Sequence, residues 1–97
     1  MLKFSKQPTE TYTIGISFDG KLPTGTSILS GVAVATDPAG SDVSGTVLGP
    51  TVSIVGTEAR FRVKSGTHGV VYRIQLLVTL DSTDVLEEDV EMTVENL

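Results

Sequence analysis

The chain has a single histidine, His68, and no cysteine, so few of its side chains could serve as a catalytic base or nucleophile. A serine nucleophile needs a base, usually histidine, that a third group orients. His68 lies within the glycine-bounded turn at residues 65–69, and turns are surface features. No further metal ligand lies near it in the sequence. We interpret His68 as an exposed turn residue and predict no enzyme activity, no cofactor and no metal.

Acidic side chains are densest between residues 81 and 91. Clustered carboxylates are the ligands that Ca²⁺ prefers, although the spacing here differs from that of an EF-hand loop. Charges on an outer strand also protect a sheet edge from aggregation. We favour edge protection and keep a cation site as the alternative hypothesis. Glu87, Asp89 and Glu91 occupy every second position and are expected on the outside of the last strand.

Basic side chains alternate with apolar ones in the segment at residues 58–64, where Ala59, Phe61 and Val63 separate the cations. This pattern predicts a strand with one dry face and one basic face. A basic stripe and an acidic stripe on one molecule would suit head-to-tail packing of identical subunits, although each also describes an ordinary solvated face. The predicted partner interface comprises Arg60, Arg62, Lys64, Glu87, Asp89 and Glu91.

Length and charge narrow the class of protein. Ninety-seven residues are about the size of one seven-stranded sandwich, so we expect a single domain over residues 1–97 with an extended N-terminal arm at residues 1–9. The net charge of −5 argues against nucleic-acid binding, which needs a basic surface. No apolar run is long enough for a membrane span, and the N-terminus lacks the apolar core of a secretion signal.

Hydrophobic residues alternate with period two along most of the chain, and no helical stripe persists. The pattern predicts an all-β, immunoglobulin-like Greek-key sandwich of about seven strands. The expected strands span residues 11–18, 27–36, 43–48, 51–55, 58–64 and 70–80, with a last strand after the turn at 81–84.

The last two strands should form an antiparallel hairpin with paired outer side chains. We expect Gln75 near Glu91 and Arg73 near Thr93. Glu88 breaks the pattern, because the alternation that buries Val90 also turns Glu88 inward. It should lie at the water-accessible end of the sheet, unless a bulge shifts the register.

The turn at residues 65–69 is expected to be structural. Gly66 and Gly69 bound it, and Tyr72 follows just inside the next strand. This placement is typical of the tyrosine corner of Greek-key sandwiches, in which the phenol bonds back to nearby backbone. The alternative is a core aromatic whose hydroxyl reaches the rim.

Two sequence motifs carry a resemblance to a known family. Lys6-Gln7-Pro8 followed by Tyr12-Thr13-Ile14 is similar to an opening K-x-P and Y-x-I pattern, and the segment at residues 61–74 is similar to a strand, G-x-x-G turn and Y-x-V strand. The chain thereby resembles short immunoglobulin-like proteins encoded among the virion structural genes of tailed bacteriophages and prophages, some called fiber-tail adaptors. The first strand of that family often ends in tryptophan, where this chain has Phe18.

The resemblance implies a non-enzymatic structural protein that acts by protein–protein assembly. Its implied partners are other phage tail, neck or fiber proteins and further copies of itself, with no nucleic acid or membrane involved. The implied location is the virion, after synthesis in the cytoplasm of the bacterial host. The alternative is an immunoglobulin-like cell-surface or carbohydrate-binding module, although the absence of tryptophan weakens sugar stacking.

Overall fold

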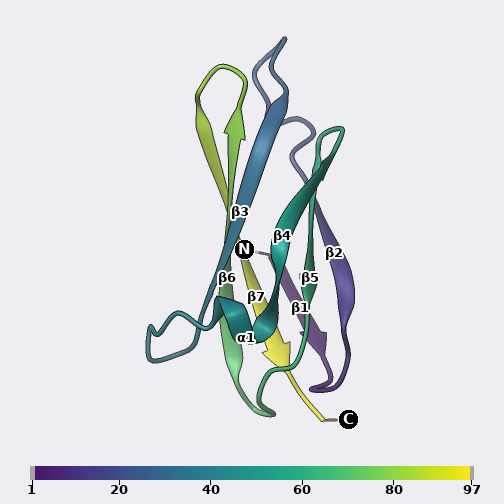
Figure 1. Ribbon diagram of the computed structural model, residues 1–97, viewed down its shortest axis with the longest axis vertical. Coiled ribbons are helices and arrows are strands. Elements are labelled where there is room, and N and C mark those ends of the chain that lie inside the picture. Colours follow the sequence, from purple (N-terminus) through teal and green to yellow (C-terminus); the bar gives the residue numbers. More distant parts are fainter. Residues whose placement is uncertain (1, 97) are drawn as a thin grey trace.

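A computed structural model describes residues 2–96, which form a β-sandwich with a single short helix. The molecule measures 43 × 23 × 23 Å, and its strands run along the long axis (Figure 1). The expected all-β sandwich is confirmed. The elements are β1 (Leu2–Lys6), β2 (Tyr12–Ser17), β3 (Ile28–Thr36), α1 (Ser44–Val47), β4 (Leu48–Val55), β5 (Glu58–Val63), β6 (Val71–Leu80) and β7 (Val85–Val94).

The seven strands of the described residues form two sheets. The four-stranded sheet has the order β1-β7-β6-β3, and the three-stranded sheet has the order β2-β5-β4. The order β2-β5-β4 matches strands B, E and D of an immunoglobulin domain, and β7-β6-β3 matches G, F and C. Strand β1 pairs with β7 in parallel, whereas every other strand pair is antiparallel.

Alternating side chains of both sheets form the core between the layers. Every second residue of β6, from Tyr72 to Leu80, is buried, and β5 buries Ala59, Phe61 and Val63. Phe18, which follows β2, is fully buried. The period-two pattern therefore identified the buried face of β5 and β6, because successive side chains of a strand point to opposite faces.

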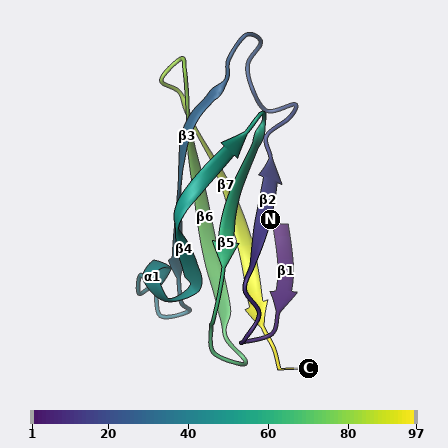
Figure 2. The ribbon, with the colours of Figure 1, turned by 45° about the vertical axis from the view of Figure 1, so that its right-hand side comes forward.

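The N-terminal segment that we expected as an arm contributes a strand. Leu2–Lys6 forms β1 along the edge of β7, while Met1 lies outside the described residues. Tyr12 of β2 holds β1 from the other sheet, because its ring packs edge-on against Phe4 with centroids 6.5 Å apart. Figure 2 shows β1 and α1 at opposite sides of the molecule.

The prediction of a strand at residues 43–48 is wrong. Residues Ser44–Val47 form the helical turn α1, and β4 begins at Leu48 and runs through Pro50 to Val55. Asp42 favours the turn, because its Oδ1 accepts hydrogen bonds from both the backbone N–H and the hydroxyl of Ser44. Pro50 is tolerated within β4 because β4 is an edge strand.

The expected register of the last hairpin is also wrong, by two residues. Arg73 lies opposite Glu91, and Gln75 lies opposite Asp89. The turn after β6 sets this register, since Leu80 N–H donates to Asp84 C=O at 2.8 Å and Thr83 adopts a φ of 71°. The hydrophobic pattern fixes which face of a strand is buried, but a shift of two residues leaves that pattern unchanged.

Glu88 does point inward, at the open end of the sandwich, and the β6–β7 register contains no bulge. Its side chain is 16% exposed and pairs with Lys21 from the loop between β2 and β3. Lys21 Nζ also lies 5.8 Å from the ring centroid of Phe18. The ion pair covers the end of the core, so the inward acid has a partner that lies far from it in the sequence.

Candidate functional site

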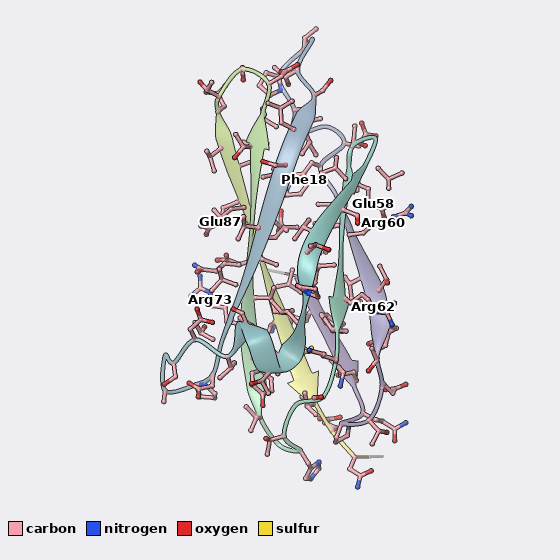
Figure 3. The ribbon with its side chains drawn as sticks, viewed as in Figure 1. Phe18, Glu58, Arg60, Arg62, Arg73 and Glu87 are labelled. Atoms are coloured by element: carbon pink, nitrogen blue, oxygen red, sulfur yellow. The ribbon has the colours of Figure 1, made fainter. Side chains whose placement is uncertain are left out.

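The two predicted charged stripes lie on opposite outer faces of the sandwich. Arg60 and Arg62 extend from β5 on the outside of the three-stranded sheet, whereas Glu87 extends from β7 on the outside of the four-stranded sheet (Figure 3). Stripes so placed cannot pair within one molecule. They can each meet a different neighbour, or each other across two copies.

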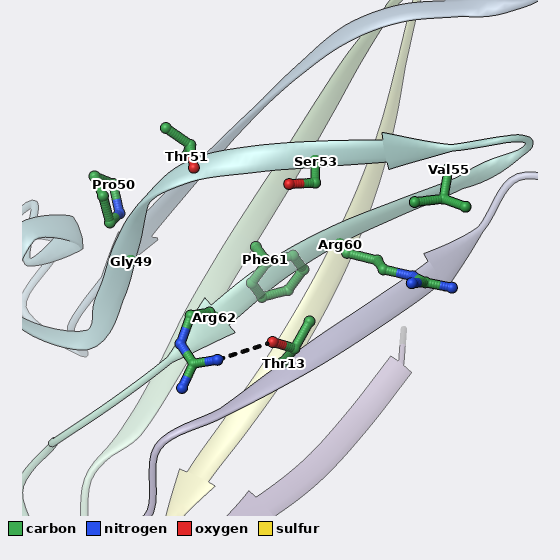
Figure 4. Close-up of a pocket in the computed structure, with 9 residues that line it drawn as sticks. All are labelled: Thr13, Gly49, Pro50, Thr51, Ser53, Val55, Arg60, Phe61 and Arg62. Carbon is green, nitrogen blue, oxygen red and sulfur yellow. Dashed lines mark hydrogen bonds between the residues drawn. The ribbon is translucent and has the colours of Figure 1, made fainter.

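A shallow hollow lies on the basic face, which we define as the outer side of β2, β5 and β4 (Figure 4). Its volume is about 410 Å³, and mostly small or hydroxyl-bearing side chains line it beside the two arginines. Arg62 Nη1 donates to Thr13 Oγ1 at 3.3 Å, and Arg60 Nε donates to Glu58 Oε2 at 2.7 Å. Among residues 2–96, both guanidinium groups keep further donors without a partner, and Arg can bind a carboxylate in bidentate fashion.

Lys64 does not share this hollow. It follows the end of β5, where its N–H donates to Val47 C=O at 2.9 Å, and it lines a separate depression beside α1 with Ser44 and Gly45. The predicted basic stripe therefore divides into an arginine pair and a more distant lysine.

We define the acidic face as the outer side of β1, β7, β6 and β3. Basic side chains on this face pair with two of its three carboxylates. Lys3 Nζ lies 3.5 Å from Glu91 Oε2, and Arg73 pairs with Asp89. Glu87 forms no salt bridge within residues 2–96. Negative charge thus remains concentrated at the β7 side of this face.

The two neighbouring acids Glu87 and Asp89 have pKa values shifted in opposite directions. The hydrogen bond from Arg73 lowers the pKa of Asp89, and the bond that a protonated Glu87 can donate to Asp89 raises the pKa of Glu87. Asp89 Oδ1 is buried and accepts no hydrogen bond from residues 2–96 in the structure. Because the pKa of Glu87 is raised and that of Asp89 is lowered, Glu87 takes up a proton before Asp89 as the pH falls.

The residues that carry the family resemblance meet at one end of the sandwich. Tyr72, 5% exposed, accepts a hydrogen bond on its hydroxyl from Thr67 N–H at 3.0 Å. Gly66 has a φ of 102°, and a Cβ at this position would lie 2.8 Å from Cγ2 of Val94. Gly69 has a φ of 84° with open space around its Cα. The turn is thus fastened to β6 and pressed against β7.

Lys6 is a buried structural side chain at this end that the sequence reasoning missed. It is only 3% exposed, and its ammonium donates to the carbonyl of Ser65 and to that of Gln7 at 2.7 Å. Burial lowers the pKa of Lys6, while the nearby Glu10 carboxylate opposes this shift. The signal was present in the K-x-P motif, which joins β1 to the 65–69 turn through this one amine.

His68 and the acidic residues of the turn at 81–84 make local hydrogen bonds. His68 is exposed, and its Nδ1 accepts from Asn96 N–H at 2.8 Å. Asp81 and Asp84 hold turn structure, since Asp81 Oδ1 accepts from Ser27 N–H and Asp84 Oδ2 accepts from Ser82 Oγ. Residues 2–96 contain no group of three or more side chains that could hold a metal ion.

The fold is an immunoglobulin-like β-sandwich that carries a basic stripe on one outer face and an acidic stripe on the other. The sequence matches the family model described as podophage GP4 fiber-tail adaptor protein gp77 over residues 6–93. The chain belongs to this family of phage fiber-tail adaptor proteins, which are structural assembly proteins of the virion. The resemblance inferred from the two motifs is confirmed.

No curated protein matches the chain. Within residues 2–96, no helix has the length and apolar character needed to cross a membrane. The family match supports the adaptor function over the cell-surface or carbohydrate-binding alternative, to which no observation points.

Proposed function

We propose that the protein is a non-catalytic adaptor that joins neighbouring phage tail and fiber proteins through its two charged faces. It would be made in the host cytoplasm and incorporated into the virion. The observation that carries the proposal is the placement of Arg60 and Arg62 on one outer face and of Glu87, Asp89 and Glu91 on the other. An adaptor needs two separate docking surfaces, and opposite faces of one rigid domain provide them.

Protein, rather than nucleic acid or lipid, is the partner that suits these faces. The net charge is −5, so a phosphate backbone or an anionic membrane would be repelled by most of the surface. The hollow on the basic face accommodates a protruding acidic side chain, and arginine binds carboxylates with defined geometry. Charge complementarity of this kind fixes register and partner choice.

We further propose that copies of the chain associate head to tail, with the basic face of one copy on the acidic face of the next. Such a contact is heterologous and can close into a ring. Lys64 lies beside α1, away from the hollow, and is assigned to the rim of this interface. Rim charges affect the rate of association more than its strength.

The test uses two neutralised variants of the whole chain. The double variant Arg60→Gln, Arg62→Gln removes the two arginine charges from the basic face. The double variant Glu87→Gln, Glu91→Gln removes two carboxylate charges from the acidic face. Sedimentation velocity of the wild type should show association at low salt that weakens as salt rises, because screening reduces surface attraction. Each variant alone should lose this salt-dependent association, and an equimolar mixture should regain a limited complex, since each supplies the face that the other lacks.

The same variants test binding to the neighbouring virion proteins. Each is coexpressed with the tail and fiber proteins of the same phage, and the complexes are captured through a tag on the adaptor. We expect the two variants to lose different partners. Retention of every partner and of salt-dependent association by both variants would disprove the role of the charged faces.

A further inference from the structure

The outer side of the four-stranded sheet is apolar near β3 and acidic near β7. Strands β3, β6 and β7 lie side by side in this sheet (Figure 1). Their register sets Val32 of β3 opposite Leu77 of β6, and Leu77 opposite Glu87 of β7. These side chains point outward, because their neighbours along the strands, such as Leu76 and Val78, face the core. One row across the sheet is therefore apolar at its first two positions and acidic at its third.

Two more valines extend the apolar part of this row. Val34 follows Val32 on the same side of β3, and Val85 of β7 lies diagonally from Leu77. Val32 and Val85 are 58% and 59% exposed, while Val34 and Leu77 are half-buried. We call these four side chains, Val32, Val34, Leu77 and Val85, the apolar band. A contiguous apolar patch rimmed by polar residues is a feature of interaction sites, whereas single exposed apolar residues are not.

Charged side chains border the apolar band on its β7 side. Ile28–Thr36 contains no charged residue, so β3 itself is neutral. Glu87 lies opposite Leu77 and forms no salt bridge within residues 2–96, whereas Asp89 pairs with Arg73. Glu87 is thus placed to receive a cation from a protein that covers the band.

The basic face of another copy matches only part of this surface. Its outward side chains on β2 and β4 include the hydroxyl groups of Ser17 and Ser53, and Val55 at the end of β4 is 50% exposed. Arg60 and Arg62 can pair with the carboxylates, but serine hydroxyls would then lie against valines. A hydroxyl that loses water without a new hydrogen bond costs free energy. The basic face of another copy therefore suits the carboxylates but not the apolar band.

Two acidic faces do not match each other either. If two sheets overlay with β6 on β6 about a two-fold axis along the strands, β7 of one copy lies on β3 of the other. Glu87 is then buried against Val32 or Val34. If the axis runs across the strands, β7 lies on β7 and carboxylates meet carboxylates. Both arrangements bury uncompensated negative charge, which is costly. The protein that covers the band must therefore differ in composition from this chain.

We propose that the apolar band anchors a tail or fiber protein whose docking surface carries apolar side chains beside lysine or arginine. The inference rests on the proposed function and adds the chemistry of the partner to it. The apolar contact supplies most of the affinity, and the ion pair at Glu87 fixes the orientation. The basic side chains of the partner should lie roughly 10 Å from the apolar ones that cover β3, because β3 and β7 are two strand spacings apart.

Matched valine substitutions on one face test the inference. The double variant Val32→Thr, Val34→Thr removes apolar surface and keeps β-branched side chains, which suit a strand. Val71→Thr makes the same change at a valine that is 39% exposed. It lies on the outer side of β6, roughly 20 Å along the strand from Leu77.

Each purified tail and fiber protein of the same phage is titrated with these variants at high salt, where head-to-tail association of copies is screened. The relevant partner is the one that the double variant Glu87→Gln, Glu91→Gln binds more weakly at low salt. For this partner, Val32→Thr, Val34→Thr should raise the Kd about tenfold or more, and Val71→Thr should change it less than about twofold. Urea melts check that each variant is folded.

Two results of the titration would overturn the inference. If the partner loses affinity for the carboxylate variant but binds the valine variant as tightly as the wild type, charge alone holds it and the proposed function stands. If no tail or fiber protein binds the wild type, the anchor has no occupant of the proposed kind. The head-to-tail association is then still judged by its own sedimentation test, so the two proposals fail separately.

Methyl NMR of the wild type supplies a second readout that needs no variant. The methyl resonances of Val32, Val34 and Leu77 should shift when the partner is added, while those of Val71 stay in place. If the same methyls shift when the concentration of this chain alone is raised, a second copy covers the band and the inference is wrong.

Discussion

The end of the sandwich around the 65–69 turn and the two outer faces use polar side chains in opposite ways. At the end, buried Lys6 and Tyr72 connect backbone segments that are distant in the sequence. On the faces, the side chains of Arg60 and Arg73 are about half exposed, and their carboxylate partners Glu58 and Asp89 are partly exposed. Buried hydrogen bonds are costly to remove, whereas exposed ion pairs contribute little to stability. The family motifs therefore maintain the fold, and the charges between them remain available for partners.

The largest stability effect is expected at Gly66. Gly66→Ala forces a side chain into a φ of 102° and against Val94, and it should cost about 3 kcal/mol of unfolding free energy. Gly69→Ala is the matched control, because its φ of 84° is strained but its surroundings are open, so about 1 kcal/mol is expected. Urea denaturation of both variants measures the difference. Equal losses would show that contact with Val94 is unimportant.

Removal of the buried ammonium should have the next largest effect. Lys6→Met preserves much of the side-chain volume but leaves the carbonyls of Gln7 and Ser65 without their donor. We expect a loss of about 2 kcal/mol in denaturant unfolding, because two part-buried hydrogen bonds from a charged donor are removed. Lys3→Met, which changes an exposed lysine of the same strand, should stay within about 0.5 kcal/mol of the wild type. A similar loss for both variants would contradict the comparison.

The phenol of Tyr72 should contribute less. Tyr72→Phe removes the hydroxyl that accepts from Thr67 N–H, and it should cost about 1 kcal/mol without changing partner binding. Thermal and urea melts check the stability, and capture of tail proteins checks the binding. An unchanged melt would mean that the bond to the turn makes no net contribution.

Neutralising the arginines of the basic face should change stability little and association strongly, the opposite of what is expected at the 65–69 turn. Arg60→Gln with Arg62→Gln should change the unfolding free energy by less than about 0.5 kcal/mol, since both side chains are exposed. The same variant should lose its salt-dependent association. A large loss of stability would show that the basic face is part of the structural framework, and the contrast with the fastened end would fail.

The smallest effect is a pH dependence on the acidic face. Arg73 lowers the pKa of Asp89 below its ordinary value of 3.8, so the stability from this pair is present above that value and is lost as the pH falls through the lowered one. The raised pKa of Glu87 acts with the opposite sign, because the folded state then binds its proton more tightly. The difference in stability between wild type and Asp89→Asn should therefore narrow in acid. A constant difference between pH values of about 6 and 2.5 would contradict this assignment.

Much of the fold could be predicted because alternation is a local property. The buried faces of β5 and β6 followed directly from period two. The helical turn at Ser44 and the strand at Leu2–Lys6 could not, since the first depends on bonds to Asp42 and the second on an unoccupied edge of β7. The register of Arg73 against Glu91 depended on turn geometry, which the pattern of side chains does not encode.

The sandwich class, the family and the outward alternation of the charged residues follow from the amino-acid sequence alone; these residues are Arg60, Arg62, Glu87, Asp89 and Glu91. The folded arrangement of the strands was needed to show that the two stripes occupy opposite faces, that Lys64 lies apart from the arginines, and that Lys6 is buried beneath the turn. The physical reason is that side-chain direction follows from position along one strand, whereas distance between charges follows from which strands share a sheet. Which strands share a sheet depends on contacts between residues far apart in the sequence, and these contacts form only when the core assembles.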